Sequence, residues 1–169
     1  LDYNSETNAR LRAAAEARGV SGDRLIFAQK IANPYHLARY PLADLFLDTL
    51  PYGAHTTASD ALWMGVPVLT LSGRCFAARV CGSLVRAAGL PDMVCDSADH
   101  FVARAIQLAG ADRLTLAAMR QRLIEGRATS TLFDIDGLAR ALEGLYAEMA
   151  GQYRAGRLPE PKLENLAAY

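Results

Sequence analysis

The sequence predicts an α/β fold, a Rossmann-like parallel sheet with helices on both faces. Short apolar runs bounded by turn residues, typical of buried strands, alternate with segments whose apolar residues recur every three or four positions. This alternation indicates a parallel sheet, because consecutive parallel strands need a crossover connection, usually a helix. Hydrophobic residues make up 51% of the 169 residues and charged residues 21%, enough apolar material for a real core.

The first part of the chain contains most of the predicted sheet. Asn4 or Ser5 is suited to cap a first helix, which Gly19 would close. Pro67 fits only the entry or the edge of a strand. The predicted elements are a helix to about residue 18, a strand over 23–29, one or two helical turns over 34–40, a strand over 43–48, a helix over 57–64 and a strand over 66–71.

The second part of the chain is predicted to be mainly helical. Apolar residues at helical spacing predict a helix over 76–88, and a brief strand over 93–95 follows. Three closing helices are expected over 97–109, 112–126 and 134–154. We expect residues 1–156 to form one lobe, incomplete at its N-terminus, with the closing helices 97–156 included and residues 157–169 as a loosely ordered tail.

Charge and cysteine content exclude several classes of protein. Basic and acidic residues both number 18, so no overall field favours nucleic acid or a membrane surface. No apolar run approaches the ~20 residues of a membrane span. Cys75, Cys81 and Cys95 have no metal-ligand spacing, and we expect them to be small core residues in a reducing, cytoplasmic compartment. The chain also lacks the sequence patterns of serine hydrolases, zinc proteases, Walker-type nucleotidases and glycine-rich dinucleotide-binding proteins.

The most informative stretch covers residues 47–65. A predicted strand leads into a loop with Pro51 and Gly53, and a helix then begins near His55, Thr56 and Thr57. Free amides, two hydroxyls and an imidazole at a helix N-terminus suit an anion such as phosphate. Asp60, one turn further on, could accept hydrogen bonds from sugar hydroxyls, so the stretch could hold a nucleotide.

A purely structural interpretation of the same residues stays open. Thr57 and Asp60 have the spacing of a capping box, in which Thr57 caps the helix and Asp60 bonds back to a backbone amide. Such a cap stabilises by ~1 kcal/mol and needs no ligand.

A second group of polar side chains follows the strand predicted over 23–29. His36 and Arg39 lie three residues apart on a short helix and would project from one side. They could contact a base, or they could belong to a solvated helix face. Loops that follow parallel strands meet at one edge of the sheet, so we expect this group to converge with the group from His55 to Asp60.

These motifs resemble the C-terminal lobe of the O-GlcNAc transferases, their bacterial homologues and the related SPINDLY proteins. The likeness runs from about Ser21 to Tyr153. Its most specific parts are His36-Leu37-Ala38-Arg39, Leu45-Phe46-Leu47-Asp48-Thr49 and Gly53-Ala54-His55-Thr56-Thr57-x-x-Asp60.

The resemblance implies a GT-B glycosyltransferase that works without a metal or cofactor. Its substrates would be UDP-N-acetylglucosamine (UDP-GlcNAc) and serine or threonine hydroxyls of an acceptor protein. By matching position, His36 and Arg39 would contact uracil, His55, Thr56 and Thr57 would hold the diphosphate, and Asp60 would bind the ribose. Asn33 stands where the animal enzymes carry a lysine near the ribose, and Ile31 would face the base through its backbone.

The resemblance also implies parts that this sequence does not contain. Neither of its two lysines, Lys30 and Lys162, matches the family's diphosphate-binding lysine. The catalytic residues, the N-terminal catalytic lobe and the tetratricopeptide (TPR) repeats would belong to the rest of the same protein, and this chain alone should be inactive. Two alternatives stay open: a SPINDLY-type transferase that uses GDP-fucose, and a non-catalytic α/β binding module.

Overall fold

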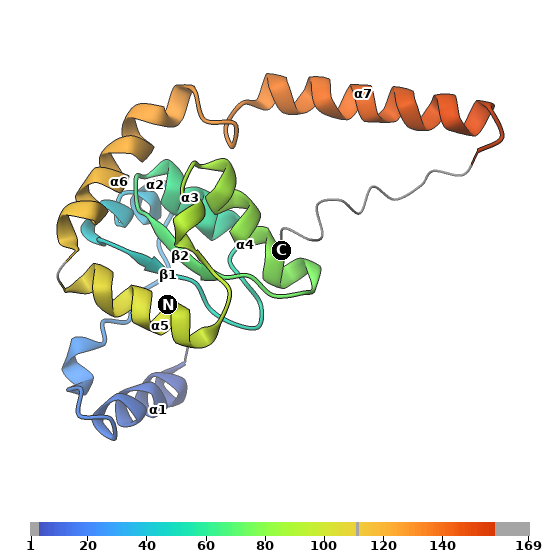
Figure 1. Cartoon of the computed structure of the whole chain (residues 1–169). Coiled ribbons are helices and arrows are strands. Elements are labelled where there is room, and N and C mark those ends of the chain that lie inside the picture. Colours follow the sequence, from blue (N-terminus) through green and yellow to red (C-terminus); the bar gives the residue numbers. More distant parts are fainter. Residues whose placement is uncertain (1–3, 111, 158–169) are drawn as a thin grey trace. The chain divides into compact units, whose positions relative to one another are not determined.

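The computed structural model describes residues 4–110 and 112–157 (Figure 1). The chain divides into two compact units, Leu1–Arg39 and Tyr40–Tyr169, and each is described by itself. The single lobe expected over residues 1–156 therefore stays a prediction. The expected loose tail over 157–169 lies outside the described residues, apart from residue 157.

The first unit begins with the predicted helix. Helix α1 (Ser5–Glu16) is capped by Asn4, whose side-chain oxygen accepts hydrogen bonds from the amides of Glu6 and Thr7 at 2.9 and 3.3 Å. Gly19, with a φ of +76°, closes the turn that follows. A 3-10 turn η1 (Gly22–Arg24) and the short helix α2 (Asn33–Leu37) complete the unit.

The strand predicted over residues 23–29 is wrong. The segment starts within η1, and its remaining residues belong to no strand. Leu25 has an extended backbone, but Ile26 is 90% exposed. A strand needs a hydrogen-bonded neighbour as well as apolar residues, and the described residues provide none along this segment.

The second unit is built on a three-stranded parallel sheet in the order β1-β2-β3. Strand β1 (Phe46–Leu47) pairs with β2 (Val68–Leu71), which pairs with β3 (Val94–Cys95). Phe46 lies opposite Val68, and Thr70 lies opposite Val94. The other three predicted strands are present but shorter than expected. Strand β2 begins directly after Pro67, as expected for a proline at a strand entry.

Helices cover both faces of the sheet, as predicted. Figure 1 shows the sheet between α3 and α4 on one side and α5 on the other, and α4 and α5 both contact β2 and β3. The helices are α3 (Thr56–Trp63), α4 (Phe76–Ala87), α5 (Ala98–Ala109), α6 (Arg113–Glu125) and α7 (Ile135–Arg154). This unit also contains three 3-10 turns: η2 (Tyr40–Leu42) before β1, η3 (Pro91–Met93) between α4 and β3, and η4 (Gly126–Ala128) between α6 and α7.

The core lies between these layers. Strand β2 is buried, and the inner stripes of α3, α4, α5 and α6 pack around it. Cys81 and Cys95 belong to this core, but Cys75 is exposed at the start of α4, so the prediction that all three cysteines are core residues is wrong for Cys75. No described side chain of α7 is buried. None of the described helices combines the length and apolarity needed to cross a membrane.

Candidate functional site

The candidate site lies between the end of β1 and the start of α3, at the carboxyl edge of the sheet. The connecting segment, residues 49–55, is called the site loop below. Ligands of open α/β sheets bind at this edge, beyond the ends of the strands. The sequence therefore placed the stretch from His55 to Asp60 at the correct end of the second unit.

Asp48 holds the site loop in place through hydrogen bonds to its backbone. It follows β1 directly and is 7% exposed. One carboxylate oxygen, Oδ1, accepts hydrogen bonds from the amides of Thr49 and Ala54 at 2.8 and 2.7 Å. The other, Oδ2, accepts one from the Thr70 hydroxyl on β2 at 2.8 Å. Asp48 thus caps the turn that follows β1, and the same carboxylate also ties this turn to the central strand.

Gly53 lets the site loop approach α4 closely. Its amide donates to the Ala77 carbonyl at 3.0 Å. A Cβ at this position would meet Asp48 Oδ2 at 3.1 Å and the Ala77 carbonyl oxygen at 3.2 Å. Any larger residue would therefore push the loop away from the carboxylate that anchors it.

His55 is the N-cap residue of α3 and is half-buried. Its Nε2 lies 3.4 Å from the Ala77 carbonyl oxygen. Its ring stacks on Tyr52 with the centroids 5.1 Å apart and meets the edge of Phe76 at 6.1 Å. The imidazole is thus held in place by α4 and by its own loop.

The N-terminus of α3 differs from the capping-box interpretation. The helix begins at Thr56, so Thr57 is its second residue and not its cap, and the actual cap residue, His55, makes no side-chain capping hydrogen bond. The amides of Ala58 and Ser59 donate to the His55 carbonyl. The amides of the first helical positions have no intrahelical acceptor, as at any helix start, and the Thr56 and Thr57 side chains beside them are exposed.

Asp60 lies one turn along α3, half-buried and close to Tyr40. The Tyr40 hydroxyl donates to the Thr57 carbonyl at 3.3 Å. Burial raises the pKa of Tyr40, and the nearby negative charge of Asp60 raises it further. The first turn of α3 therefore carries two hydroxyl groups, and one carboxylate follows at the start of the next turn.

The other predicted contact residues lie in the first unit. Ile31 precedes α2, Asn33 opens this helix, and both are exposed. His36 is half-buried in the last turn of α2, and Arg39, also half-buried, donates from Nη2 to the Gln29 carbonyl at 2.8 Å. The convergence of these residues with the site at α3 stays a prediction. That prediction assumed that each group follows a strand. This is true of the group from His55 to Asp60, which follows β1, but not of His36 and Arg39.

Sequence reasoning missed three participants. Thr70, Tyr40 and Tyr52 support the site loop and α3 through the contacts given above, yet none was singled out. Thr70 could have been found, because a polar residue inside an apolar strand needs a buried hydrogen-bond partner. The contacts of Tyr40 and Tyr52 depend on tertiary packing and have no local signature.

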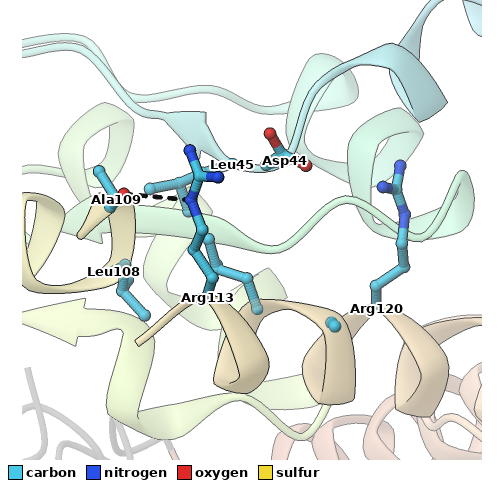
Figure 2. Close-up of a pocket in the computed structure, with 8 residues that line it drawn as sticks. Asp44, Leu45, Leu108, Ala109, Arg113 and Arg120 are labelled. Atoms are coloured by element: carbon cyan, nitrogen blue, oxygen red, sulfur yellow. Dashed lines mark hydrogen bonds between the residues drawn. The ribbon is translucent and has the colours of Figure 1, made fainter. Parts of the chain in front are cut away.

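A cavity of about 280 Å³ lies elsewhere in the second unit. Figure 2 shows it beside Asp44 and Leu45, which precede β1, with Arg113 and Arg120 projecting from α6. Arg113 donates from Nε to the Ala109 carbonyl, and Arg120 donates to the carbonyls of Pro41 and Ala43. The cavity contains none of the predicted site residues. We place the candidate site at the carboxyl edge of β1 because the side chains predicted to bind an anion, His55, Thr56 and Thr57, gather there.

The donor set at the start of α3 is of the kind that accepts an anion. Among the described residues, no group of three or more histidine, cysteine, aspartate or glutamate side chains is arranged to hold a metal ion. The uncapped start of α3 instead offers hydrogen-bond donors and the positive end of a helix dipole.

The fold is that of a Rossmann-like lobe of a GT-B glycosyltransferase, with a helix start that lacks a side-chain cap at the carboxyl edge of its sheet. The chain belongs to glycosyl transferase family 41, whose family model matches residues 1–142.

Two curated relatives illustrate the match. The chain is 35% identical over 156 residues to the UDP-N-acetylglucosamine–peptide N-acetylglucosaminyltransferase of Caenorhabditis elegans, which covers 92% of this chain and 14% of the relative. It is 37% identical over 129 residues to the probable UDP-N-acetylglucosamine–peptide N-acetylglucosaminyltransferase SPINDLY of Solanum lycopersicum. This match covers 76% of this chain and 14% of the relative.

A solved structure supports the same fold. The Thermobaculum terrenum O-GlcNAc transferase mutant K341M superposes with a TM-score of 0.76 at 38% sequence identity. The match covers 86% of this chain and 28% of that structure. The chain thus spans only a small part of the proteins that it resembles.

Proposed function

We propose that this chain is the donor-binding lobe of an inverting glycosyltransferase that transfers N-acetylglucosamine from UDP-GlcNAc to serine or threonine hydroxyls of proteins. Membership of glycosyl transferase family 41 supports the reaction class. Because the chain spans 14% of the curated relatives described above, transfer would need the rest of a longer protein. An N-terminal catalytic lobe and a TPR region of that protein would supply the catalytic residues and the acceptor site.

The start of α3 is the observation that carries this proposal. An N-terminus without a side-chain cap, with two exposed threonines and a fixed histidine beside it, suits a diphosphate. In the proposal, His55, Thr56 and Thr57 hold the phosphates. If the threonines served only to cap the helix, one of them would be expected at the N-cap position, which His55 occupies.

The other roles follow from position. Asp60 would accept hydrogen bonds from the ribose hydroxyls, next to the Tyr40 hydroxyl that already braces the first turn of α3. His36 and Arg39 would contact the uracil, with Asn33 and Ile31 near the ribose and base. These four roles rest on the family match and need the two units to bring the groups together.

The chemistry would depend on the leaving group. As an acceptor hydroxyl attacks the anomeric carbon, the bond to the β-phosphate oxygen breaks and negative charge develops on UDP. Donors that are already oriented stabilise such charge without reorganising, which is usually the largest catalytic contribution. No metal is needed in this scheme, since amide, hydroxyl and imidazole donors take the leaving group.

Calorimetric titration of the full-length protein with UDP tests the proposal. Thr57→Val keeps the shape of the side chain and removes its hydroxyl. We expect Kd for UDP to rise about tenfold or more, as for the loss of a ~1.5–3 kcal/mol hydrogen bond to a charged group. Thr7→Val, at an exposed position of α1, is the matched control and should leave Kd unchanged.

The same titration separates the alternatives. Tighter binding of GDP than of UDP would point to a SPINDLY-type enzyme that uses GDP-fucose. Absence of binding by either nucleotide, together with a lower melting temperature in Thr57→Val, would indicate a non-catalytic α/β module and would contradict the proposal.

A further inference from the structure

The buried carboxylate of Asp48 is a titratable group that the proposed reaction does not use. Burying a charged group is costly unless hydrogen bonds replace its hydration. Asp48 meets this condition with three donors: the amides of Thr49 and Ala54 and the hydroxyl of Thr70. These hydrogen bonds therefore define where the carboxylate and its partners must lie.

Through these three donors, Asp48 links the site loop to the central strand β2. Thr70 is fully buried in the central strand β2 and gives the carboxylate a rigid support. Thr49 and Ala54 lie near the two ends of the site loop. Ala54 directly precedes His55, the N-cap residue of α3, so one carboxylate oxygen sets both ends of the loop and the first residue of the site.

The surroundings of Asp48 are closed on the side of α4. Gly53 passes so near that an added Cβ would lie 3.1 Å from Oδ2, and its amide is held by the Ala77 carbonyl. Cys81, fully buried, lies within hydrogen-bonding reach of both Asp48 and Thr70. The carboxylate thus lies in close contact with the loop on one side and with Cys81 of α4 on another.

We propose that Asp48 is a positioning residue, which holds the site loop so that His55 and the first turn of α3 meet the donor diphosphate. This inference rests on the proposed function. It adds a residue that acts through Ala54 and His55 without touching the ligand, because its acceptor oxygens are already directed at the loop and at β2.

Two substitutions of Asp48 separate hydrogen-bond geometry from other effects. Asp48→Ala removes all three acceptor contacts. Asp48→Asn can keep them: Oδ1 still accepts from both amides, and Nδ2 can donate to the Thr70 hydroxyl, which turns to accept. In the full-length protein, we expect Asp48→Ala to raise Kd for UDP by roughly tenfold to a hundredfold, because the hydrogen bonds that place the His55 end of the loop are lost. Asp48→Asn should restore binding close to that of the wild type.

If Asp48 contributed only to stability, its substitution would not change KM for the donor selectively. At a temperature well below all melting transitions, Asp48→Ala should raise KM for the sugar-nucleotide donor and leave KM for an acceptor peptide unchanged. Asp44→Ala, which removes an exposed carboxylate just before β1, is the matched control and should change neither value.

A third variant keeps the test valid if Asp48→Ala does not fold. Gly53→Ala leaves the carboxylate in place but inserts a methyl group against Asp48 and Ala77. It should displace the loop and raise Kd for UDP in the same direction.

The possible failures are distinguishable. A wild-type protein that binds neither UDP nor GDP would overturn the proposed function and this inference with it. If the wild type binds UDP, an unchanged Kd in Asp48→Ala, or in Gly53→Ala when the former does not fold, would overturn the inference alone. Equal losses in Asp48→Asn and Asp48→Ala would do the same, because the geometry of the hydrogen bonds would then not be the cause.

Discussion

At the scale of single residues, the three cysteines show how position decides reactivity. Cys81 and Cys95 are buried, whereas Cys75 is exposed at the N-cap of α4. Burial raises the pKa of Cys81 to about 12, and the charge of Asp48 contributes in the same direction. Burial and the nearby Asp96 also raise the pKa of Cys95. A high pKa keeps a thiol protonated, and the protonated thiol is not the nucleophile.

Thiol labelling tests this difference. At pH 8, we expect iodoacetamide to modify Cys75 in the native protein and to reach Cys81 and Cys95 only after unfolding. Mass spectrometry of the labelled peptides identifies the sites. Rapid native labelling of Cys81 would contradict its burial.

The raised pKa of Cys81 also has a consequence for stability. The folded state binds the thiol proton more tightly than the unfolded chain, whose thiol titrates near the ordinary value of 9.0. This contribution to the free energy of unfolding is fully present below pH 9 and is lost as the pH rises toward 12. Urea unfolding between pH 8 and 10.5 should show a smaller loss of stability in Cys81→Ala than in the wild type.

At the scale of elements, the sequence predicted best those segments that bury their own apolar side chains locally. The helix expected over 76–88 is α4, since its apolar stripe faces the sheet whatever the neighbouring strands do. The strand expected over 23–29 failed because a strand is completed by a partner distant in sequence. The start of α3 was misplaced by one residue, because the backbone of the site loop, and not a side-chain cap, sets where the helix begins.

The end of α3 gives a prediction about backbone conformation. Gly65 has a φ of +80°, and an added Cβ would meet the Ile124 side chain at 2.8 Å. Gly65→Ala should therefore lower the free energy of unfolding by at least about 1–2 kcal/mol. Gly126→Ala, where nothing lies within 4 Å and φ is −80°, is the matched control and should be neutral or slightly stabilising. Urea denaturation measures both, and an equal loss in the two variants would contradict the assignment.

Helix α6 offers a second matched pair. Leu116 is 7% exposed and faces the core, whereas Leu114 is 86% exposed. Leu116→Ala should cost about 2–5 kcal/mol of unfolding free energy. Leu114→Ala should stay within about 0.5 kcal/mol of the wild type. The opposite order in chemical denaturation would mean that α6 packs on another face.

At the scale of the whole molecule, burial is unevenly distributed. The core gathers around β2, while α7, twenty residues long, has no buried side chain among those described. Amphipathic spacing predicted this helix correctly, but the spacing alone could not say that its apolar stripe would lie exposed. The site shows the same limit. Topology placed His55 and Asp60 at the carboxyl edge, while the supporting contacts of Asp48, Thr70 and Tyr40 depend on residues that meet only in the folded chain.

Hydrogen exchange should report this unevenness. Amides open locally at a lower free energy where few apolar contacts resist opening. We therefore expect the backbone amides of α7 to exchange with deuterium much faster than those of α4, whose inner face is buried. Mass spectrometry of the peptic peptides covering each helix measures the two rates. Similar protection of both helices would show that α7 is covered in solution.

The anchoring of the site loop also bears on how such a chain can be altered. Gly53 and Ala54 are fixed by backbone hydrogen bonds, whereas Leu50 and Tyr52 are 52% and 66% exposed. Extra residues or a fluorescent probe would be accommodated at Leu50, which Gly53 and Ala54 separate along the chain from His55. The same geometry leaves natural variation room to lengthen the loop there, while the last two positions before His55 tolerate almost none.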